Sequence, residues 1–215
     1  MKALALFSGG KDSTLSLFLA LQRGLEVSLL SIMAEKDSMM YHYPNISLTK
    51  AQAKAMGLQH FFCDEGKEKE RIKEIRDSYG IEALVCGAVK SDYQRTRIER
   101  MCYELGLKFY APLWNLSAER IYNAIFDSGF RFIITSVSAD GFDESWLGRE
   151  ITKDNLHELM DLCSKYGINP VFEGGEAETF VFDGPLFKRA LSIKSARKSF
   201  RNFSGVYEIT ELAYE

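Results

Sequence analysis

The chain has 215 residues, 46% of them hydrophobic and 27% charged, a balance typical of a globular protein with one sizeable core. Its formal net charge of -3 does not indicate a general nucleic-acid-binding surface. The four cysteines form no CxxC pair, so the sequence indicates free thiols rather than a zinc knuckle or a redox pair. The chain starts on a core-like strand and has no apolar run of membrane-spanning length, so we expect a cytoplasmic protein.

The first residues predict a phosphate-binding junction. An apolar strand at residues 3–7 leads into a glycine turn at residues 8–13, and a helical pattern follows over residues 14–23. Glycine lets the backbone approach a ligand closely, and the start of the helix directs free N–H groups and its positive dipole end to the same point. Lys11 adds a mobile positive charge, and Asp12 either caps the helix or reaches Mg²⁺ through water. The candidate phosphate ligands are therefore Ser8, Gly9, Gly10, Lys11, Asp12 and Ser13.

This junction differs from two common nucleotide motifs. The P-loop of nucleoside triphosphatases needs Gly where Ala5 stands, and Ser or Thr directly after the lysine, where this chain has Asp12. The turn does not fit the GxGxxG pattern of dinucleotide-binding folds either. A turn whose glycines serve geometry alone is the alternative, but two serines, a lysine and an aspartate in one turn favour a ligand site.

Strand-like and helical patterns then alternate. Strands are predicted over residues 27–33, 59–63, 83–86, 108–110 and 130–137, and helices over residues 47–56, 67–79, 92–105 and 117–128. Repeats of this length predict a parallel sheet with right-handed crossovers and helices on both faces, which is the doubly wound α/β class.

Loops that follow the predicted strands are candidates for the ligand site, because such sheets bind ligands beyond the carboxyl ends of their strands. These loops are residues 8–13, 34–46, 87–92, 112–116 and 138–149. In the third of them, Gly87 and Ser91 are small enough to let a nucleotide approach closely. The helix behind it brings three more side chains toward the same crevice: Tyr93, Gln94 and Arg97. The alternative is that Ser91 or Asp92 caps this helix and Arg97 is a solvated charge.

The last third carries an acidic glycine motif after a predicted helix over residues 152–166. The motif consists of Glu173, Gly174, Gly175, Glu176, Ala177, Glu178 and Thr179. Carboxylates this close repel one another, so the motif favours a cation such as Mg²⁺ or a substrate ammonium group, or protons held with raised pKa values. The alternative is a glycine turn with solvated glutamates ahead of a strand at residues 179–182.

A basic stretch follows the acidic motif. Antiparallel strands are predicted over residues 190–193 and 204–212, with basic residues between them. These residues are Lys188, Arg189, Lys194, Arg197, Lys198 and Arg201. They can dock an acidic partner or RNA, or they can form a solvated sheet face, which is the commoner use of such charges.

Two motifs together carry a resemblance to a known family. The turn at residues 8–13 resembles the PP-loop of the N-type ATP pyrophosphatases, which activate an oxygen by adenylation and release pyrophosphate. With the acidic motif and residues 183–187, the chain is similar to the diphthine–ammonia ligase family over nearly its whole length. Further agreeing segments are residues 42–45, 87–97, 111–114, 146–149 and 166–170. One departure is Phe172, where the family has a small residue, often Gly.

The resemblance implies a fold of the adenine nucleotide alpha hydrolase-like type (PP-loop, HUP). This is a doubly wound, mainly parallel sheet with a small α+β C-terminal part. We expect an ATP-binding domain over residues 1–138 and a smaller substrate-binding part with the acidic motif over residues 139–215. The length corresponds to a short form of archaeal type, without the C-terminal domains that eukaryotic members carry.

The resemblance also implies an activity, the ATP-dependent amidation of diphthine on translation elongation factor 2 to diphthamide. The substrate carboxylate becomes an acyl-adenylate, and free ammonium supplies the nitrogen, since the chain has no glutaminase domain. ATP and Mg²⁺ are the implied cofactors, and AMP and pyrophosphate are the products. No membrane and no stable nucleic acid partner is expected, and a homodimer is left open.

The site residues implied by the resemblance fall into three groups. The catalytic group is Lys11, Asp12, Glu173, Glu176 and Glu178, with Asp12 also the metal ligand. The ATP-binding group is Ser8, Gly9, Gly10, Lys11, Asp12, Ser13, Met33, Gly87 and Ser91. The substrate group is His42, Tyr43, Tyr93, Gln94, Arg97, Trp114, Trp146 and Arg149, whose aromatic members are a candidate cage for a trimethylammonium group.

Two other interpretations stay open. One is a PP-loop enzyme that modifies tRNA by adenylating a base carbonyl, although such chemistry usually needs placed cysteines, a zinc ribbon or a more basic chain. The other is a nonenzymatic ATP-binding module, against which the intact turn and the acidic motif argue.

Overall fold

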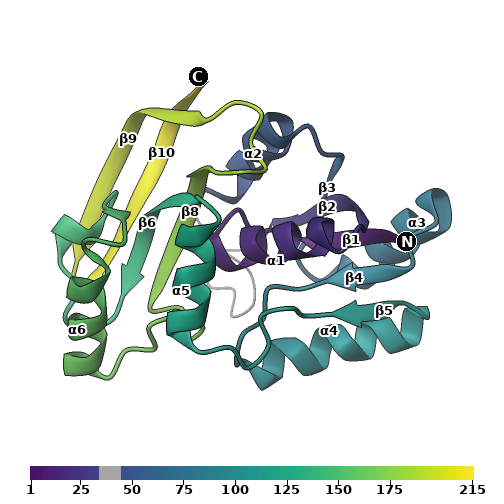
Figure 1. Cartoon of the computed structure of the whole chain (residues 1–215), viewed down its shortest axis with the longest axis horizontal. Helices are drawn as coiled ribbons and strands as arrows, with labels where there is room; N and C mark the ends of the chain where they lie inside the picture. Colours follow the sequence, from purple (N-terminus) through teal and green to yellow (C-terminus); the bar gives the residue numbers. More distant parts are fainter. Residues whose placement is uncertain (34–44) are drawn as a thin grey trace.

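Two five-stranded sheets with flanking helices form the protein, whose computed structural model describes residues 1–33 and 45–215 (Figure 1). The strands are β1 (Lys2–Leu6), β2 (Glu26–Met33), β3 (His60–Asp64), β4 (Ala83–Val85), β5 (Lys108–Tyr110), β6 (Arg131–Ser138), β7 (Glu150–Ile151), β8 (Ala177–Asp183), β9 (Leu191–Arg201) and β10 (Ser204–Tyr214). The helices are α1 (Lys11–Gln22), α2 (Thr49–Met56), α3 (Glu68–Tyr79), α4 (Asp92–Leu105), α5 (Ala118–Asp127) and α6 (Leu156–Tyr166), with short 3-10 turns η1 (Ile46–Leu48) and η2 (Glu144–Trp146).

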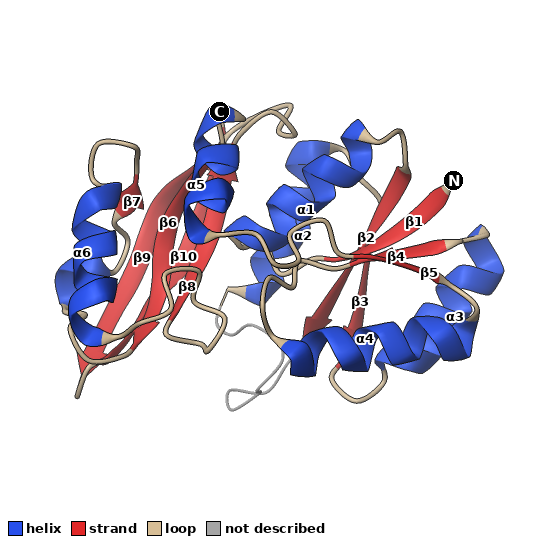
Figure 2. Cartoon of the chain, turned by 60° about the horizontal axis from the view of Figure 1, so that its bottom comes forward, coloured by secondary structure: helices blue, strands red, loops and turns tan. Residues whose placement is uncertain are grey.

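The first sheet is parallel, with the strand order β3-β2-β1-β4-β5. Figure 2 shows α1 and α2 on one face and α3 and α4 on the other. Alternate residues of β1 explain this cover, because Ala3 and Ala5 pack with α1 and α2, whereas Leu4 packs with α3 and α4. The doubly wound α/β class predicted from the sequence is confirmed.

The strand order places the ligand site. The chain leaves β1 toward β2 and β3, and returns to the other side of β1 at β4, so the order reverses between β1 and β4. Their register, Ala3 opposite Ala83 and Ala5 opposite Val85, brings the turn after β1 beside the loop after β4. A crevice at such a reversal is where doubly wound sheets bind ligands.

The second sheet is antiparallel, with the order β7-β6-β10-β9, and β8 pairs with β6. The sequence analysis assigned the strand at residues 130–137 to the parallel sheet, but this strand is β6 of the second sheet. An apolar run buried on both faces looks the same in either sheet, so the pattern could not assign it. The strands of the two sheets therefore separate in the chain between β5 and β6. The domain division expected after residue 138 stays a prediction.

Other elements differ from expectation at their ends. The helix predicted from residue 152 begins at Leu156, because the side chain of Asn155 accepts the backbone N–H of Thr152 at 2.8 Å and holds an initial turn. Strand β9 is longer than predicted, and its hairpin to β10 turns at Asn202 and Phe203, both at positive φ (50° and 61°). A two-residue turn with left-handed residues suits the twist of a long hairpin. In the described part of the chain, no helix has the length and apolar character needed to cross a membrane.

A half-buried histidine supports the turn after β1 through Ser31. His60 of β3 places Nε2 2.8 Å from Oγ of Ser31, which donates to the carbonyl of Phe7 at 2.6 Å. Because the Ser31 hydroxyl donates its hydrogen to the carbonyl of Phe7, Nε2 of His60 must carry a hydrogen and donate it to Ser31. Burial lowers the pKa of His60 from 6.5 to about 4, and its Nδ1 is buried with no hydrogen-bond partner among the described residues. The neutral imidazole is therefore the form that the fold holds.

This histidine predicts a pH dependence of stability. Below about pH 6.5 the unfolded chain binds a proton at His60, whereas the folded chain does so only near pH 4, so stability falls across this interval. His60→Gln retains a donor and removes the titration, so we expect a shallower loss of melting temperature between pH 7 and pH 4.5 than in the wild type. The matched control is His157→Gln, at an exposed position on α6, which should keep the wild-type slope. Equal slopes in all three proteins would exclude His60 as the titrating group.

Candidate functional site

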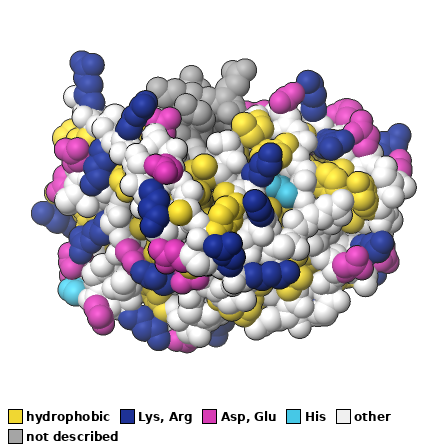
Figure 3. All heavy atoms as spheres, turned by 90° about the horizontal axis from the view of Figure 1, so that it is seen from above, with side chains coloured by type: hydrophobic (Ala, Val, Ile, Leu, Met, Phe, Trp, Pro, Cys, Tyr) yellow, Lys and Arg dark blue, Asp and Glu magenta, His cyan; other side chains and the backbone are white. Residues whose placement is uncertain are grey.

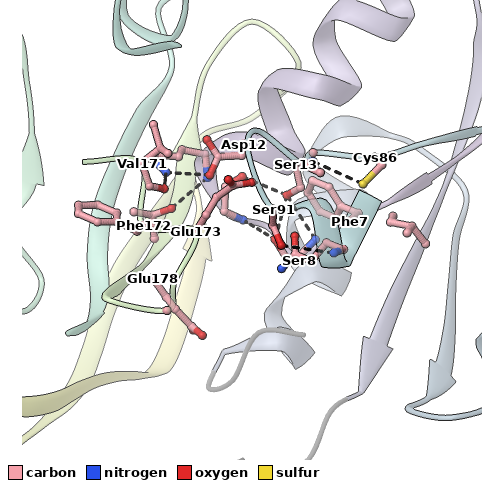
Figure 4. Close-up of a pocket in the computed structure, with 18 of the residues that line it drawn as sticks. Phe7, Ser8, Asp12, Ser13, Cys86, Ser91, Val171, Phe172, Glu173 and Glu178 are labelled. Carbon is pink, nitrogen blue, oxygen red and sulfur yellow. Dashed lines mark hydrogen bonds and ion pairs between the residues drawn. The ribbon is translucent and has the colours of Figure 1, made fainter. Parts of the chain in front are cut away.

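A cavity of about 560 Å³ lies at the reversal between β1 and β4, within the range that small-molecule sites occupy (Figure 4). One wall is the turn after β1, and another is residues 171–179 from the second half of the chain. Its lining also includes the apolar side chains Leu30, Ile32, Ile98 and Cys86. The site is thus built jointly by both halves of the chain, polar at the turn and apolar beside it.

The turn after β1 is tightly organised around two glycines. Gly9 has φ +79°, a left-handed conformation that suits glycine. A Cβ on Gly10 would lie 3.2 Å from both the carbonyl oxygen and Oγ1 of Thr179, so Gly10 permits the close approach of β8. The hydroxyl groups of Ser8 and Ser13 lie 3.0 Å apart, and that of Ser13 donates to the Gly10 carbonyl at 3.1 Å. Since N–H groups in the first turn of a helix have no intrahelical acceptor, this geometry suits an anion.

Lys11 does not supply the mobile charge that the sequence analysis expected. Its side chain is 2% exposed, and Nζ lies 2.7 Å from Oδ2 of Asp12 and 2.8 Å from the carbonyl oxygen of Val171. The ammonium group also lies 5.1 Å from the ring centroid of Phe172. Lys11 thus joins the turn to residues 171–172, and three contacts fix its position.

Asp12 faces the cavity with one carboxylate oxygen unsatisfied. Oδ2 pairs with Lys11, while Oδ1 is buried and has no hydrogen-bond partner among the described residues. A buried bare carboxylate oxygen is costly unless a cation or a donor completes it. The described residues contain no group of three or more His, Cys, Asp or Glu that could hold a metal ion. Asp12 therefore fits a Mg²⁺ ion that takes most of its ligands from phosphate and water, as Mg²⁺ commonly does.

The three glutamates of the acidic motif, all within the described residues, do not form a group that could hold a metal ion, which was one of the alternatives that the sequence left open. The carboxylate of Glu173 accepts the backbone N–H groups of Val89, at 2.5 Å, and Lys90. The carboxylate of Glu176 accepts those of Gly174, at 2.9 Å, and Asn169, at 3.3 Å.

These backbone bonds explain how the motif tolerates its charge. Each N–H pair stabilises one carboxylate, so Glu173 and Glu176 do not need a shared cation. Glu178 lines the cavity and, in Figure 4, extends away from Glu173.

Phe172, where the resemblance implied a small residue, has a left-handed backbone conformation. Its φ is +66°, which a bulky residue adopts at a cost of about 1–3 kcal/mol. The ring is buried, packs against Phe142 at a centroid distance of 6.1 Å, and faces Lys11. The buried ring offsets the backbone strain, so the left-handed shape that glycine would take freely is retained.

Several predicted residues meet in the cavity. Ser8, Gly10, Lys11, Asp12, Ser13, Gly87, Ser91, Tyr93, Gln94, Glu173 and Glu178 all line it. Ser91 also caps α4 by accepting the N–H of Gln94 at 3.3 Å, so the capping alternative holds as well. Tyr93 is 60% exposed, which is unusual for a large aromatic side chain that lines a cavity. From β2, Ile32 lines the cavity, whereas Met33 does not.

Other predicted substrate residues lie elsewhere. Arg97 pairs with the buried Glu68 at 3.5 Å. Trp114 packs under Arg95, whose guanidinium lies 4.7 Å from its ring. None of these residues is part of the cavity lining.

Trp146 belongs to the second half's core, Arg149 lies over its ring, and neither residue lines the cavity. Trp146 is 6% exposed and packs edge-on against Phe142 at 5.7 Å. Arg149 covers the Trp146 ring at 4.6 Å and pairs with Glu158 at 2.6 Å. Trp146, a large apolar residue of the predicted substrate group, is therefore a core residue, which is the commoner role of such side chains. His42 and Tyr43 lie outside the described residues.

Sequence reasoning missed two residues that hold the turn. Thr179 Oγ1 accepts the backbone N–H of Lys11 at 3.0 Å, and so caps α1 from a strand 168 positions away. Gln52 of α2 is fully buried beside Gly9. A lone Gln in a helical pattern carries no sequence signal for such a contact, whereas Thr179 at least belongs to the acidic motif.

Two family models match the chain: the diphthamide synthase N-terminal domain over residues 1–109 and the diphthamide synthase C-terminal domain over residues 117–213. A curated human protein named diphthine–ammonia ligase is 31% identical, over 91% of this chain and 84% of its own length. The protein of that name from Schizosaccharomyces pombe is 33% identical, over 89% of this chain and 36% of its own length. Among solved structures, a predicted subunit of tRNA methyltransferase from Methanocaldococcus jannaschii has a TM-score of 0.46 at 19% identity, and the match covers 86% of this chain and 100% of that one. The turn after β1 lies in the first matched region and the acidic motif in the second, so the two regions meet at the cavity.

Proposed function

The chain belongs to the diphthamide synthase family, whose curated members are diphthine–ammonia ligases, and from this premise we propose that it uses ATP to convert the carboxylate of diphthine to the amide of diphthamide. The observation that carries the proposal is the shared cavity, with an anion-binding turn on one wall and the acidic motif on the other. An ATP-dependent ligase needs both a phosphate site and a place for the acceptor beside it.

The proposed reaction has two steps. A carboxylate oxygen of the substrate attacks the α-phosphate of ATP, which forms an acyl-adenylate and releases pyrophosphate. Ammonia then attacks the acyl carbon, and the bond to the AMP oxygen breaks. Adenylation is useful because AMP leaves more readily than oxide or hydroxide would.

The residues of the turn have defined parts in this scheme. The backbone of Gly10 and the hydroxyl groups of Ser8 and Ser13 bind the β- and γ-phosphates at the start of α1. The apolar side chains of Leu30 and Ile32 pack against the adenine ring. Asp12 would hold a Mg²⁺ ion, which would neutralise part of the negative charge of the triphosphate.

The substrate side of the cavity is assigned to Glu178 and Tyr93. Diphthine carries a quaternary ammonium group, which an aromatic face and a carboxylate both attract. Glu178 and Tyr93 line the cavity, and the exposed ring of Tyr93 lies at its rim. They replace Trp114 and Trp146 as the residues that meet this group.

We expect Glu178→Gln to raise the KM for the protein substrate about tenfold, since a charge pair near a protein surface contributes roughly 1–4 kcal/mol. The KM for ATP should change by less than about twofold, because Gln keeps the size of the side chain. Steady-state kinetics with each substrate varied in turn checks this, with Glu208→Gln, on the exposed side of β10, as the control. An unchanged KM for the protein substrate would remove Glu178 from its recognition.

Translation elongation factor 2 bearing diphthine is the proposed protein substrate, and ammonium is the proposed nitrogen donor. The names of the curated relatives support diphthine as the group that is modified and ammonia as the nitrogen source. A homodimer and a cytoplasmic location stay predictions.

The cysteine thiols support a tRNA-modifying function less well than they would if they were reactive. Cys86 lines the cavity, but burial raises the pKa of its thiol to about 11, and burial likewise raises that of Cys102 to about 12. Such thiols stay protonated and make poor nucleophiles for sulfur transfer. On the face shown in Figure 3, Lys and Arg side chains are interspersed with Asp and Glu, unlike a continuous basic surface for RNA.

One assay separates the three functions. The protein is incubated with ATP, Mg²⁺, ammonium and diphthine-bearing elongation factor, and the products are examined for AMP and for the small mass decrease of a carboxyl group that becomes an amide. We expect AMP and the amidated protein to form in equal amounts. AMP that forms only with tRNA would overturn the ligase assignment, and ATP binding without turnover on either substrate would indicate a binding module.

A further inference from the structure

Gln52 occupies an unusual position behind the phosphate-binding turn. Its side chain is 0% exposed, and it does not line the cavity. Nε2 donates to the carbonyl of Gly9 at 2.9 Å and to the carbonyl of Val181 at 2.7 Å. The side chain thus bridges the turn after β1 and strand β8, which belong to different halves of the chain.

The geometry requires a donor that carries two hydrogens on one atom. The carbonyl of Gly9 already accepts the N–H of Val181 at 3.0 Å, so Gly9 and β8 are paired, and their two carbonyls converge on one point. The NH₂ of an amide supplies both hydrogens from one nitrogen. If the amide were rotated by half a turn, its oxygen would face two carbonyl oxygens, so the observed orientation is the favourable one.

This arrangement has a cost that packing alone does not explain. Oε1 of Gln52 is buried and has no hydrogen-bond partner among the described residues, which costs about 1–3 kcal/mol. A Cβ on Gly9 would lie 2.2 Å from this oxygen, so the amide also enforces glycine at the turn. An apolar side chain would fill the same space without an unsatisfied oxygen, but it would remove the donor that the carbonyls of Gly9 and Val181 share.

We infer that Gln52 is a positioning residue for the ATP site. By holding the Gly9 carbonyl in its pairing with β8, it fixes the backbone of the turn, and with it the start of α1, at the wall of the cavity. By holding Val181, it keeps β8, with Glu178 and Thr179, in register with the turn. It touches neither substrate, so it acts only through the turn. This inference rests on the proposed ATP site.

The test compares Gln52→Leu with Gln52→Glu. We expect Q52L to raise the KM for ATP about tenfold, equivalent to loss of roughly 1.4 kcal/mol, while the KM for ammonium stays unchanged. In Q52E, an ionised carboxylate faces two carbonyl oxygens, whereas the protonated form donates to one of them. The KM for ATP of Q52E should therefore fall as the pH is lowered, relative to the wild type. Gln22→Leu, at an exposed position near the end of α1, is the matched control.

The outcomes distinguish this inference from the proposed function. Binding of ATP by the wild type, measured by calorimetry, tests the ATP site first, and its absence would overturn the proposed function. If the wild type binds ATP, an unchanged KM in Q52L would overturn the role of Gln52. A proportional loss of all activities with the folded fraction would show a merely structural role. Should Q52L fail to fold, the pH-dependent recovery of Q52E decides, and its absence contradicts the inference.

Discussion

Replacing Asp12 by Asn is expected to lower AMP formation by about 10²–10³-fold while the protein stays folded. The unsatisfied Oδ1 of Asp12 is buried at the cavity, where a carboxylate suits a cation and a neutral amide does so far less. Loss of one such charge at a phosphoryl-transfer site is worth about 3–4 kcal/mol of transition-state stabilisation. The fold should persist because the Asn side-chain oxygen can still accept the ammonium of Lys11, as Asp12 does at 2.7 Å. AMP release from labelled ATP over a Mg²⁺ titration measures the effect.

The control for Asp12→Asn is Asp127→Asn, an acidic residue that pairs with Lys153 on the surface. This variant should keep wild-type AMP formation and Mg²⁺ dependence. AMP formation by Asp12→Asn within about twofold of the wild type, with the same Mg²⁺ dependence, would remove Asp12 from the metal site.

The first half of the site could be predicted because its signals are local. A strand, a glycine turn and a helix follow one another between residues 2 and 22, so their order in the sequence is their order in space. The alternation of strands and helices likewise indicated the parallel sheet, and α4 begins at Asp92 and ends at Leu105 as predicted. Each of these features depends on neighbours within a few residues.

The direction of side chains in the site could not be predicted in the same way. The acidic motif suggested shared cations because its carboxylates are close in sequence, but Glu173 binds backbone N–H groups 83 and 84 positions away. Lys11 donates to the carbonyl of Val171, 160 positions away. Such pairings arise only when two distant segments fold together, so no local pattern contains them.

The segment that carries the motif is held in place by three parts of the molecule. Tyr122 of α5, whose hydroxyl is fully buried, donates to the carbonyl of Pro170 at 2.7 Å. Burial, with a smaller effect of Asp12, raises the pKa of Tyr122 and keeps this donor protonated. Lys11 holds Val171, and Glu173 is held by the loop after β4. Ordered in this way, the motif presents Gly174, Gly175 and Glu178 to the cavity.

Replacing Lys11 by Met should lower kcat for amide formation by about 10²-fold and leave the KM for ATP within about threefold of the wild type. The ammonium of Lys11 contacts Asp12, the carbonyl of Val171 and the ring of Phe172, so it positions the acidic segment rather than the phosphates. Met retains the apolar stem but leaves Asp12 without its partner and Val171 without its donor. Removing one partner of a largely buried ion pair lowers the free energy of unfolding by about 2–4 kcal/mol. Lys11→Met should therefore unfold at a lower urea concentration than the wild type.

The split between kcat and KM decides which role Lys11 has. If Lys11 bound the phosphates directly, Lys11→Met would raise the KM for ATP and leave the single-turnover rate at saturating ATP nearly unchanged. Lys90→Met serves as the control, because Lys90 is exposed and only its backbone N–H contacts Glu173. A strained Phe172 backbone gives a second readout: without the ammonium against its ring, residues 171–172 should exchange their amide protons faster than in Lys90→Met. If amide exchange is unchanged and the KM for ATP is raised, the result would indicate that Lys11 binds the phosphates directly.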